Sequence, residues 1–264
     1  MSIFTIAMQY FESIIKFMEF VTINDEVQDE AAILELIAND LRPFYEPRLP
    51  YHNWDEHIAS GMAVINQICS EAQSKGRKVN TFMAQVAYLG HDAGYAHDLL
   101  NSDVWQEYGS KEAYSAHIMA SVLRNYDMEE DFISGVQTCI MFTKMDEKLD
   151  HSMDEELANT AKAVRMTDLY NVFGSYKGFI INSFKLMEED RVYGRERNLA
   201  EFKDVTKFVL TSFLDVDFLP VASCKAVDGM NNIERFMKDT PSRLISLLGT
   251  YANRFANLIN SKAA

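Results

Sequence analysis

The sequence predicts an all-α fold, and three observations support this prediction. Apolar residues recur at three- and four-residue spacing along most of the chain, which is the period of a helix buried on one face. Only five prolines and eleven glycines occur in 264 residues, so a turn-rich β architecture is disfavoured. No clear β-run, repeat or low-complexity segment interrupts this pattern. We therefore expect a bundle of helices.

Two amphipathic helices are expected at the start of the chain. The apolar residues of 3–21 and of 27–41 both follow the helical period. Three prolines between residues 43 and 50 then enclose an irregular stretch, because proline lacks an amide donor and biases the residue before it away from the helical region. We expect the helices of residues 1–44 to pack on the core that follows.

The helix after this stretch has a clear start signal. Asn53 is a suitable N-cap, and Asp55 and Glu56 fall in the first turn, where acidic side chains favour the positive end of the helix dipole. This helix is expected to run to about Ser74 and to place His57 on its inward face.

The remaining helices are predicted in the same way. A helix over residues 81–90 is expected to present His91 and Asp92 at its buried C-terminal end. Further helices are expected over residues 111–126, 131–144, 155–173, 196–214, 226–237 and 241–260. No Gly/Ser-rich linker separates them, so we interpret residues 45–178 as the core and 179–264 as a helical extension of the same domain.

Composition limits the classes of function. The chain is 48% hydrophobic and 24% charged, which suffices for one sizeable core. A net charge of -14 repels duplex nucleic acid, whereas a small phosphate ester can still bind where a divalent cation dominates the local field. Three widely spaced cysteines suit a reducing cytoplasm. Polar and charged residues interrupt the apolar N-terminus, so no membrane span is expected, and the oligomeric state stays open.

Four residues predict a metal site. His91 and Asp92 are adjacent at the end of an apolar helix, where burying an imidazole and a carboxylate is costly unless a partner or a metal compensates. His57 faces inward, and Asp168 lies close to the core-facing stripe of its own helix. Two imidazoles and two carboxylates are a suitable ligand set for a divalent metal.

This order of a histidine, a later His-Asp pair and a distant Asp resembles the HD-domain metal-dependent phosphohydrolases. The preceding Tyr51-His52-Asn53 is similar to a motif of the cyclic-nucleotide phosphodiesterases in the same superfamily. The resemblance covers about residues 45–175 and implies an HD-type helical bundle that hydrolyses a phosphate ester with metal-activated water.

The resemblance also implies roles for individual residues. The metal ligands would be His57, His91, Asp92 and Asp168. Asp92 would also act in catalysis by bridging to a second metal through its other oxygen. His52 would be the acid that protonates the leaving oxygen, kept protonated by a carboxylate such as Asp55 or Glu56. In the family the ligand follows this acid by four residues, whereas here the step is five, which a loop position of His52 before the helix would accommodate.

The expected cofactor follows from the ligand types. Nitrogen and oxygen ligands without thiolate suit manganese, iron, cobalt or zinc, and magnesium suits only a second, oxygen-rich position. His97, His117 and Glu112 are candidates for that second position or for hydrogen bonds to the first ligands; the segment with Glu112 resembles a Glu-x-x-Ser-Ala pattern of HD proteins. His151, in a polar turn, is interpreted as an ordinary hydrogen-bonded imidazole.

Candidate substrate contacts are less specific. Lys144 and Arg165 could bind phosphate, and Tyr51 and Trp54 offer aromatic faces to a base. Phosphodiesterases for cyclic mononucleotides hold the purine with a late glutamine, yet no glutamine follows Gln137 here. We therefore expect a nucleotide-like or other small phosphate ester as the partner, without narrowing it further.

Two alternative functions keep the fold. Some HD-like proteins are diiron oxygenases, but these need a further histidine about one helix after His117, where this chain has Cys139, Thr143 and Lys144. A degenerate HD scaffold would bind a nucleotide or a protein without catalysis. The presence of all four candidate ligands argues against full degeneracy.

Overall fold

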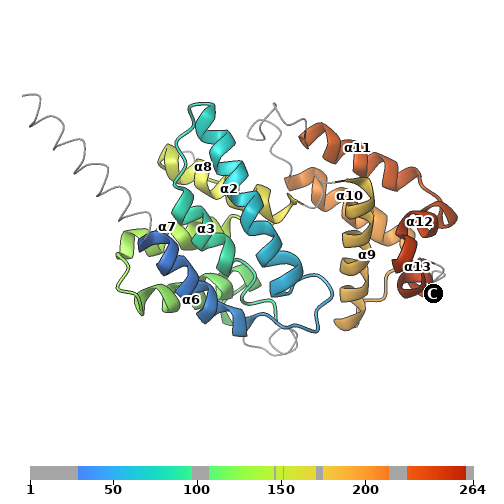
Figure 1. Cartoon of the computed structure of the whole chain (residues 1–264), viewed down its shortest axis with the longest axis horizontal. Helices are drawn as coiled ribbons and strands as arrows, with labels where there is room; N and C mark the ends of the chain where they lie inside the picture. The colour runs from blue at the N-terminus through green and yellow to red at the C-terminus, as the bar shows by residue number, and fades with distance from the viewer. Residues whose placement is uncertain are drawn as a thin grey trace, which may run out of the picture. The chain divides into compact units, whose positions relative to one another are not determined.

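The computed structural model describes residues 29–96, 107–145, 147–150, 152–170, 175–213 and 225–259 (Figure 1). All regular structure in these ranges is helical, without a strand, which confirms the predicted all-α class. The predicted helix over 3–21 lies outside the described residues, and the one over 27–41 is described from residue 29. Contacts divide the chain into two units, Met1–Asp40 and Leu41–Ala264. The finer division into core and extension stays a prediction.

Five helices of the second unit surround the predicted site. They are α2 (Ala59–Ser74), α3 (Thr81–Gly90), α6 (Lys111–Arg124), α7 (Glu130–Met141) and α8 (Glu155–Asp168). Helix α3 contacts the other four, and Figure 1 shows it among them. Six of its ten residues, including Tyr88, are buried, as expected for a helix that is apolar on several faces. The polar residues that follow α3 therefore emerge inside the bundle.

The later helices pack mainly around α9 (Tyr176–Val192), which contacts α11 (Lys225–Lys238), α12 (Pro241–Leu248) and α13 (Ala252–Ile259). Helix α10 (Leu199–Phe213) packs against α11. Phe184 of α9 is fully buried, with its ring centroid 5.7 Å from that of Phe255. The single helix predicted over 241–260 is wrong, because Gly249 adopts a φ of 57° and a 3-10 turn over Gly249–Tyr251 separates α12 from α13.

The close approach of α2 to α3 depends on Gly61. A Cβ atom at this position would lie 1.9 Å from Tyr88 Oη, which donates a hydrogen bond to the carbonyl of His57. Gly61 therefore leaves room for the buried phenol beside the metal-site helices.

Gly61→Ala is expected to lower the free energy of unfolding by about 1–3 kcal/mol, because the added methyl group overpacks the contact with Tyr88. This cost outweighs the higher helix propensity of alanine relative to glycine. Urea denaturation measures the change. Gly178→Ala in α9 is the matched control, because its Cβ would meet only the Ser175 hydroxyl, at 3.2 Å. Equal stability of Gly61→Ala and the wild type would contradict the packing argument.

Candidate metal centre

A π-helical turn places His57. The turn spans Trp54–Ile58 directly before α2. Asn53 caps it, because its side-chain oxygen accepts the amide of Glu56 at 2.9 Å and its side-chain nitrogen donates to the carbonyl of Leu49 at 2.7 Å. The predicted N-cap is thus confirmed. His52 precedes this extended N-cap and is therefore free of the helix phase, as expected for the five-residue step from His52 to His57.

His91 and Asp92 follow from the end of α3. Asn80 caps the start of the helix by accepting the amide of Met83, and the helix ends with His91 as its C-cap. His91 Nδ1 lies 2.6 Å from the carbonyl oxygen of Tyr88 and must donate to it, since that oxygen can only accept. This bond leaves the lone pair on Nε2 available to a metal.

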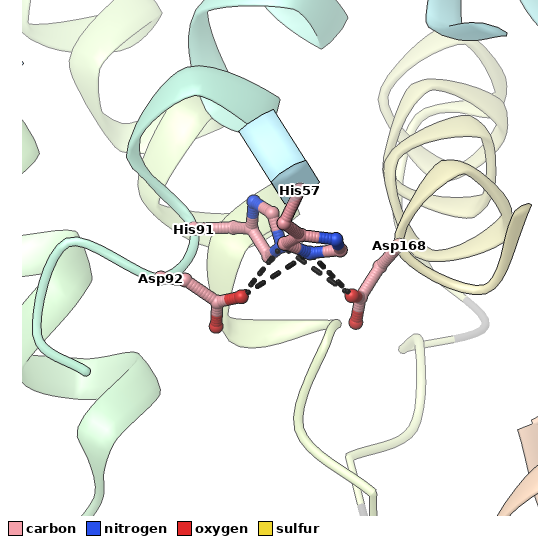
Figure 2. A group of neighbouring side chains, drawn as sticks. All are labelled: His57, His91, Asp92 and Asp168. Atoms are coloured by element: carbon pink, nitrogen blue, oxygen red, sulfur yellow. Dashed lines mark hydrogen bonds and ion pairs between the residues drawn. The ribbon is translucent and has the colours of Figure 1, made fainter. Parts of the chain in front are cut away.

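Asp168 is the last residue of α8, with a side chain 26% exposed. The predicted helix over 155–173 is therefore too long: α8 ends at Asp168, and residues 171–174 lie outside the described ranges. Because Asp168 lies at the end of α8, its carboxylate points towards His57 and His91 (Figure 2).

The four predicted ligands meet at one point (Figure 2). His57 Nε2 lies 3.1 Å from His91 Nε2, 3.3 Å from Asp92 Oδ2 and 3.2 Å from Asp168 Oδ1. His91 Nε2 lies 3.1 Å from Asp92 Oδ2 and 3.4 Å from Asp168 Oδ1. One donor atom from each residue lies within 4.8 Å of all the others. Both imidazoles are fully buried, and Asp92 is 2% exposed.

These distances fit a single metal ion. Bonds of about 2.0–2.2 Å from one ion to nitrogen and oxygen place neighbouring donor atoms about 3.0–3.5 Å apart. Asp92 Oδ2 is buried and accepts no well-formed hydrogen bond from the described residues, although two imidazoles lie close to it. A buried carboxylate oxygen in this state is costly unless a cation meets it. The residues therefore fit a divalent metal held by all four side chains.

The charges of the cluster agree with this interpretation. Burial raises the pKa of Asp92, but His91, Lys111 and His52 more than offset this and hold the pKa well below its usual value. Burial lowers the pKa of His91, whereas Asp92 and Asp168 raise it to about 10 overall. The pKa of His57 is likewise raised, because Asp168 and Asp92 outweigh the effect of burial. The two carboxylates thus favour positive charge at the centre of the cluster, and a divalent ion would supply that charge by displacing the Nε2 protons of the histidines.

Glu189 of α9 supports His52. His52 Nδ1 is hydrogen-bonded to Glu189 Oε1, and the amides of Tyr51 and His52 donate to Glu189 Oε2 at 3.1 and 2.9 Å. Burial raises the pKa of Glu189, but His52 and these hydrogen bonds lower it below the usual value. His52 also stacks on Tyr95, with ring centroids 4.0 Å apart, and its Nε2 lies 3.9 Å from Asp92 Oδ2.

This finding corrects the expected partner of His52. Asp55 pairs with Arg42 and Glu56 with Lys185, so neither bonds to His52. Glu189 was missed because it lies in a charged run and follows Lys185 by four residues, a spacing typical of a surface ion pair within one helix. Its side chain is instead 2% exposed.

Lys111 was also missed by sequence reasoning. Its Nζ lies 3.2 Å from Asp92 Oδ1, 3.2 Å from Glu112 Oε1 and 4.5 Å from the ring centre of Tyr95. No motif identified it, since a lysine in the first turn of an amphipathic helix is usually solvated.

Of the residues considered for a second metal, Glu112 and His117 are described, and these two do not belong to a second metal-binding group. Glu112 is buried near the site through Lys111, whereas His117 is exposed and packs on Tyr108, with ring centroids 4.9 Å apart. His97 and His151 lie outside the described residues. Within the described ranges, the four ligands above are the one group of His, Cys, Asp or Glu able to hold a metal.

Arg165 is engaged by the backbone. Its guanidinium donates to the carbonyls of Phe142, Lys144 and Glu147 at 2.5, 3.0 and 2.9 Å and lies 3.4 Å from the ring centre of Phe142. These bonds hold the loop after α7 and leave few donors for phosphate. Lys144 is half-buried in this loop.

The two aromatic candidates differ. Tyr51 is buried, with its ring centroid 4.8 Å from both His52 and His57, so it packs beneath the histidines. Trp54 is half-buried, 5.5 Å from the ring of Tyr45. Their roles in binding substrate stay predictions.

Comparison with solved structures gives one informative match. The phosphodiesterase domain of the RhoPDE fusion protein from the choanoflagellate Salpingoeca rosetta superimposes with a TM-score of 0.56 over 81% of this chain and 83% of that chain. The chain has the fold of a phosphodiesterase domain. At 15% sequence identity the similarity concerns the fold alone. Family models and curated proteins give no match to the sequence. The described helices include none long and apolar enough to cross a membrane.

Proposed function

We propose that the protein is a metal-dependent phosphohydrolase that acts on a nucleotide-like phosphate ester. The observation that carries the proposal is the convergence of two buried imidazoles and two carboxylates at bonding distance of one ion, beside the His52–Glu189 pair. The fold shared with a phosphodiesterase domain supports a phosphate ester as the substrate class.

Four residues would hold the metal: His57, His91, Asp92 and Asp168. A divalent ion of manganese, iron, cobalt or zinc suits them, and it would supply water of lowered pKa and polarise a phosphoryl oxygen. The bond from His91 to the carbonyl of Tyr88 keeps the ring oriented with Nε2 towards the ion. Burial of His57, His91 and Asp92 strengthens electrostatic interactions in the site.

His52 is suited to proton transfer. Glu189 binds Nδ1 and so directs Nε2 towards the metal site, while stacking on Tyr95 fixes the plane of the ring. Glu189 is itself held by two backbone amides. We infer that His52 donates its Nε2 proton to the departing oxygen and that Glu189 acts through it as a positioning residue.

The proposal is tested by hydrolysis of bis-p-nitrophenyl phosphate. The wild type is expected to need Mn²⁺ or a similar ion and to lose activity in EDTA, and Asp168→Ala is expected to be inactive while remaining folded, because one missing ligand opens the coordination sphere without a large cavity. Asp131→Ala, at an exposed position of α7, is the matched control and should keep full activity. Full activity of the wild type in EDTA would rule out the mechanism.

The substrate class is tested by a panel. Nucleoside monophosphates, deoxynucleotides, cyclic mononucleotides and cyclic dinucleotides are incubated with Mn²⁺, and products are followed by phosphate release and chromatography. One class should be turned over well above the others. Tight binding of one member without turnover would instead indicate a binding scaffold, and oxygen consumption by an iron-loaded sample would indicate an oxygenase.

A further inference from the structure

The two oxygens of Asp92 have different partners. Oδ2 faces the two histidines of the metal site at 3.1 and 3.3 Å. Oδ1 faces away from them and is bonded to the ammonium of Lys111 at 3.2 Å. Oδ1 is the oxygen through which Asp92 would bridge to a second metal, and it is already bonded to the positively charged ammonium of Lys111.

Lys111 is held at this place by its surroundings. It is the first residue of α6, whose N-cap Ser110 accepts the amide of Ala113. The start of α6 lies tightly against the turn after Asp92, since a Cβ at Gly94 would come 2.8 Å from the carbonyl oxygen of Lys111. The ammonium then lies between Glu112 and the face of Tyr95, at 3.2 Å from the carboxylate and 4.5 Å from the ring centre.

A second divalent ion would have to bind beside Asp92 Oδ1, where the ammonium of Lys111 lies. In two-metal sites the ions lie about 3.5–4 Å apart and share a bridging carboxylate, so the second ion would contact Asp92 Oδ1. Like charge from Lys111 disfavours this, as does the positive N-terminal end of α6. Glu112, the carboxylate that the sequence suggested for such an ion, is paired with Lys111.

We propose that the site takes one divalent ion and that the ammonium of Lys111 supplies the positive charge that a second ion would otherwise supply. The catalytic part of this proposal rests on the proposed function: Lys111 would contact an oxygen of the phosphoryl group as charge develops on it. A fixed ammonium can perform this electrostatic task, but it cannot activate water.

Metal stoichiometry tests the proposal without relying on activity. Purified protein is titrated with Mn²⁺, and bound metal is measured by elemental analysis and by electron paramagnetic resonance, which separates isolated from spin-coupled ions. The wild type is expected to bind one isolated Mn²⁺ per chain. Lys111→Gln is expected to bind a second, weaker ion that couples to the first, because the bridging oxygen becomes free.

Two further variants control the experiment. Lys111→Arg keeps the charge and should keep the stoichiometry of one. Lys78→Gln makes the same substitution at an exposed lysine before α3, at the opposite end of that helix from His91, and should match the wild type. At Mn²⁺ concentrations that fill the first site alone, Lys111→Gln should hydrolyse bis-p-nitrophenyl phosphate about 100-fold more slowly than the wild type. This loss is similar to the effect of removing one oxyanion-hole donor.

The outcomes separate this inference from the proposed function. Two coupled ions in the wild type, or one ion in both the wild type and Lys111→Gln, would overturn the inference and leave a metal hydrolase intact. The expected stoichiometries without any hydrolysis would support the single-ion site and contradict the proposed function. A wild type without bound metal would overturn both.

Discussion

His91→Ala and Asp92→Ala are each expected to leave the protein without stoichiometric metal and to lower turnover by about a thousandfold or more. The bound ion supplies several kcal/mol of transition-state stabilisation, and about 1.4 kcal/mol corresponds to a factor of ten in rate. Both residues are almost fully buried, and their ligand atoms lie within 4.8 Å of those of the other ligands. The described part of the chain offers no further group of His, Cys, Asp or Glu that could replace them.

Metal content and thermal unfolding measure this effect together. A ligand that binds only the folded state at about 100 times its Kd stabilises it by about 2.7 kcal/mol, so added Mn²⁺ should raise the Tm of the wild type and of Asp131→Ala. The Tm of His91→Ala and Asp92→Ala should not respond. Equal metal content in all four proteins would contradict the assignment of the site.

His52→Ala is expected to lower kcat by about 10²–10⁴-fold while metal content stays near normal, because His52 transfers a proton and does not hold the ion. The loss should shrink for substrates with good leaving groups such as p-nitrophenolate, which need little protonation. His57→Ala should lower both kcat and metal content, since His57 lies among the ligands. If His52→Ala empties the site and His57→Ala does not, the two roles are reversed.

Glu189→Gln extends this test to the residue that positions His52. We expect a smaller loss of kcat in the same direction, again dependent on the leaving group, with normal metal content. Glu188→Gln is the matched control, because this neighbouring carboxylate pairs with Arg254 at the surface. A loss in Glu189→Gln that is independent of the leaving group would indicate a merely structural role.

Much of the local structure was predictable from the sequence. The helical period predicted the helix over 81–90 that ends at His91, and the apolar setting of Asp92 predicted that it turns inwards. These features depend on short-range spacing and on the cost of burying charge, both of which are visible in a single chain. The grouping of the four candidate ligands followed from the same signals together with the resemblance to HD domains.

The tertiary structure alone decided how the surrounding charges are used. It pairs Glu189 with His52, more than a hundred residues away, and it places Lys111 on the second oxygen of Asp92. It also directs Arg165 to backbone carbonyls and not towards an open site. Sequence periodicity assigns a residue to a helix face, but long charged side chains reach several ångströms from that face. Their partners therefore depend on which helices pack together, which no local pattern encodes.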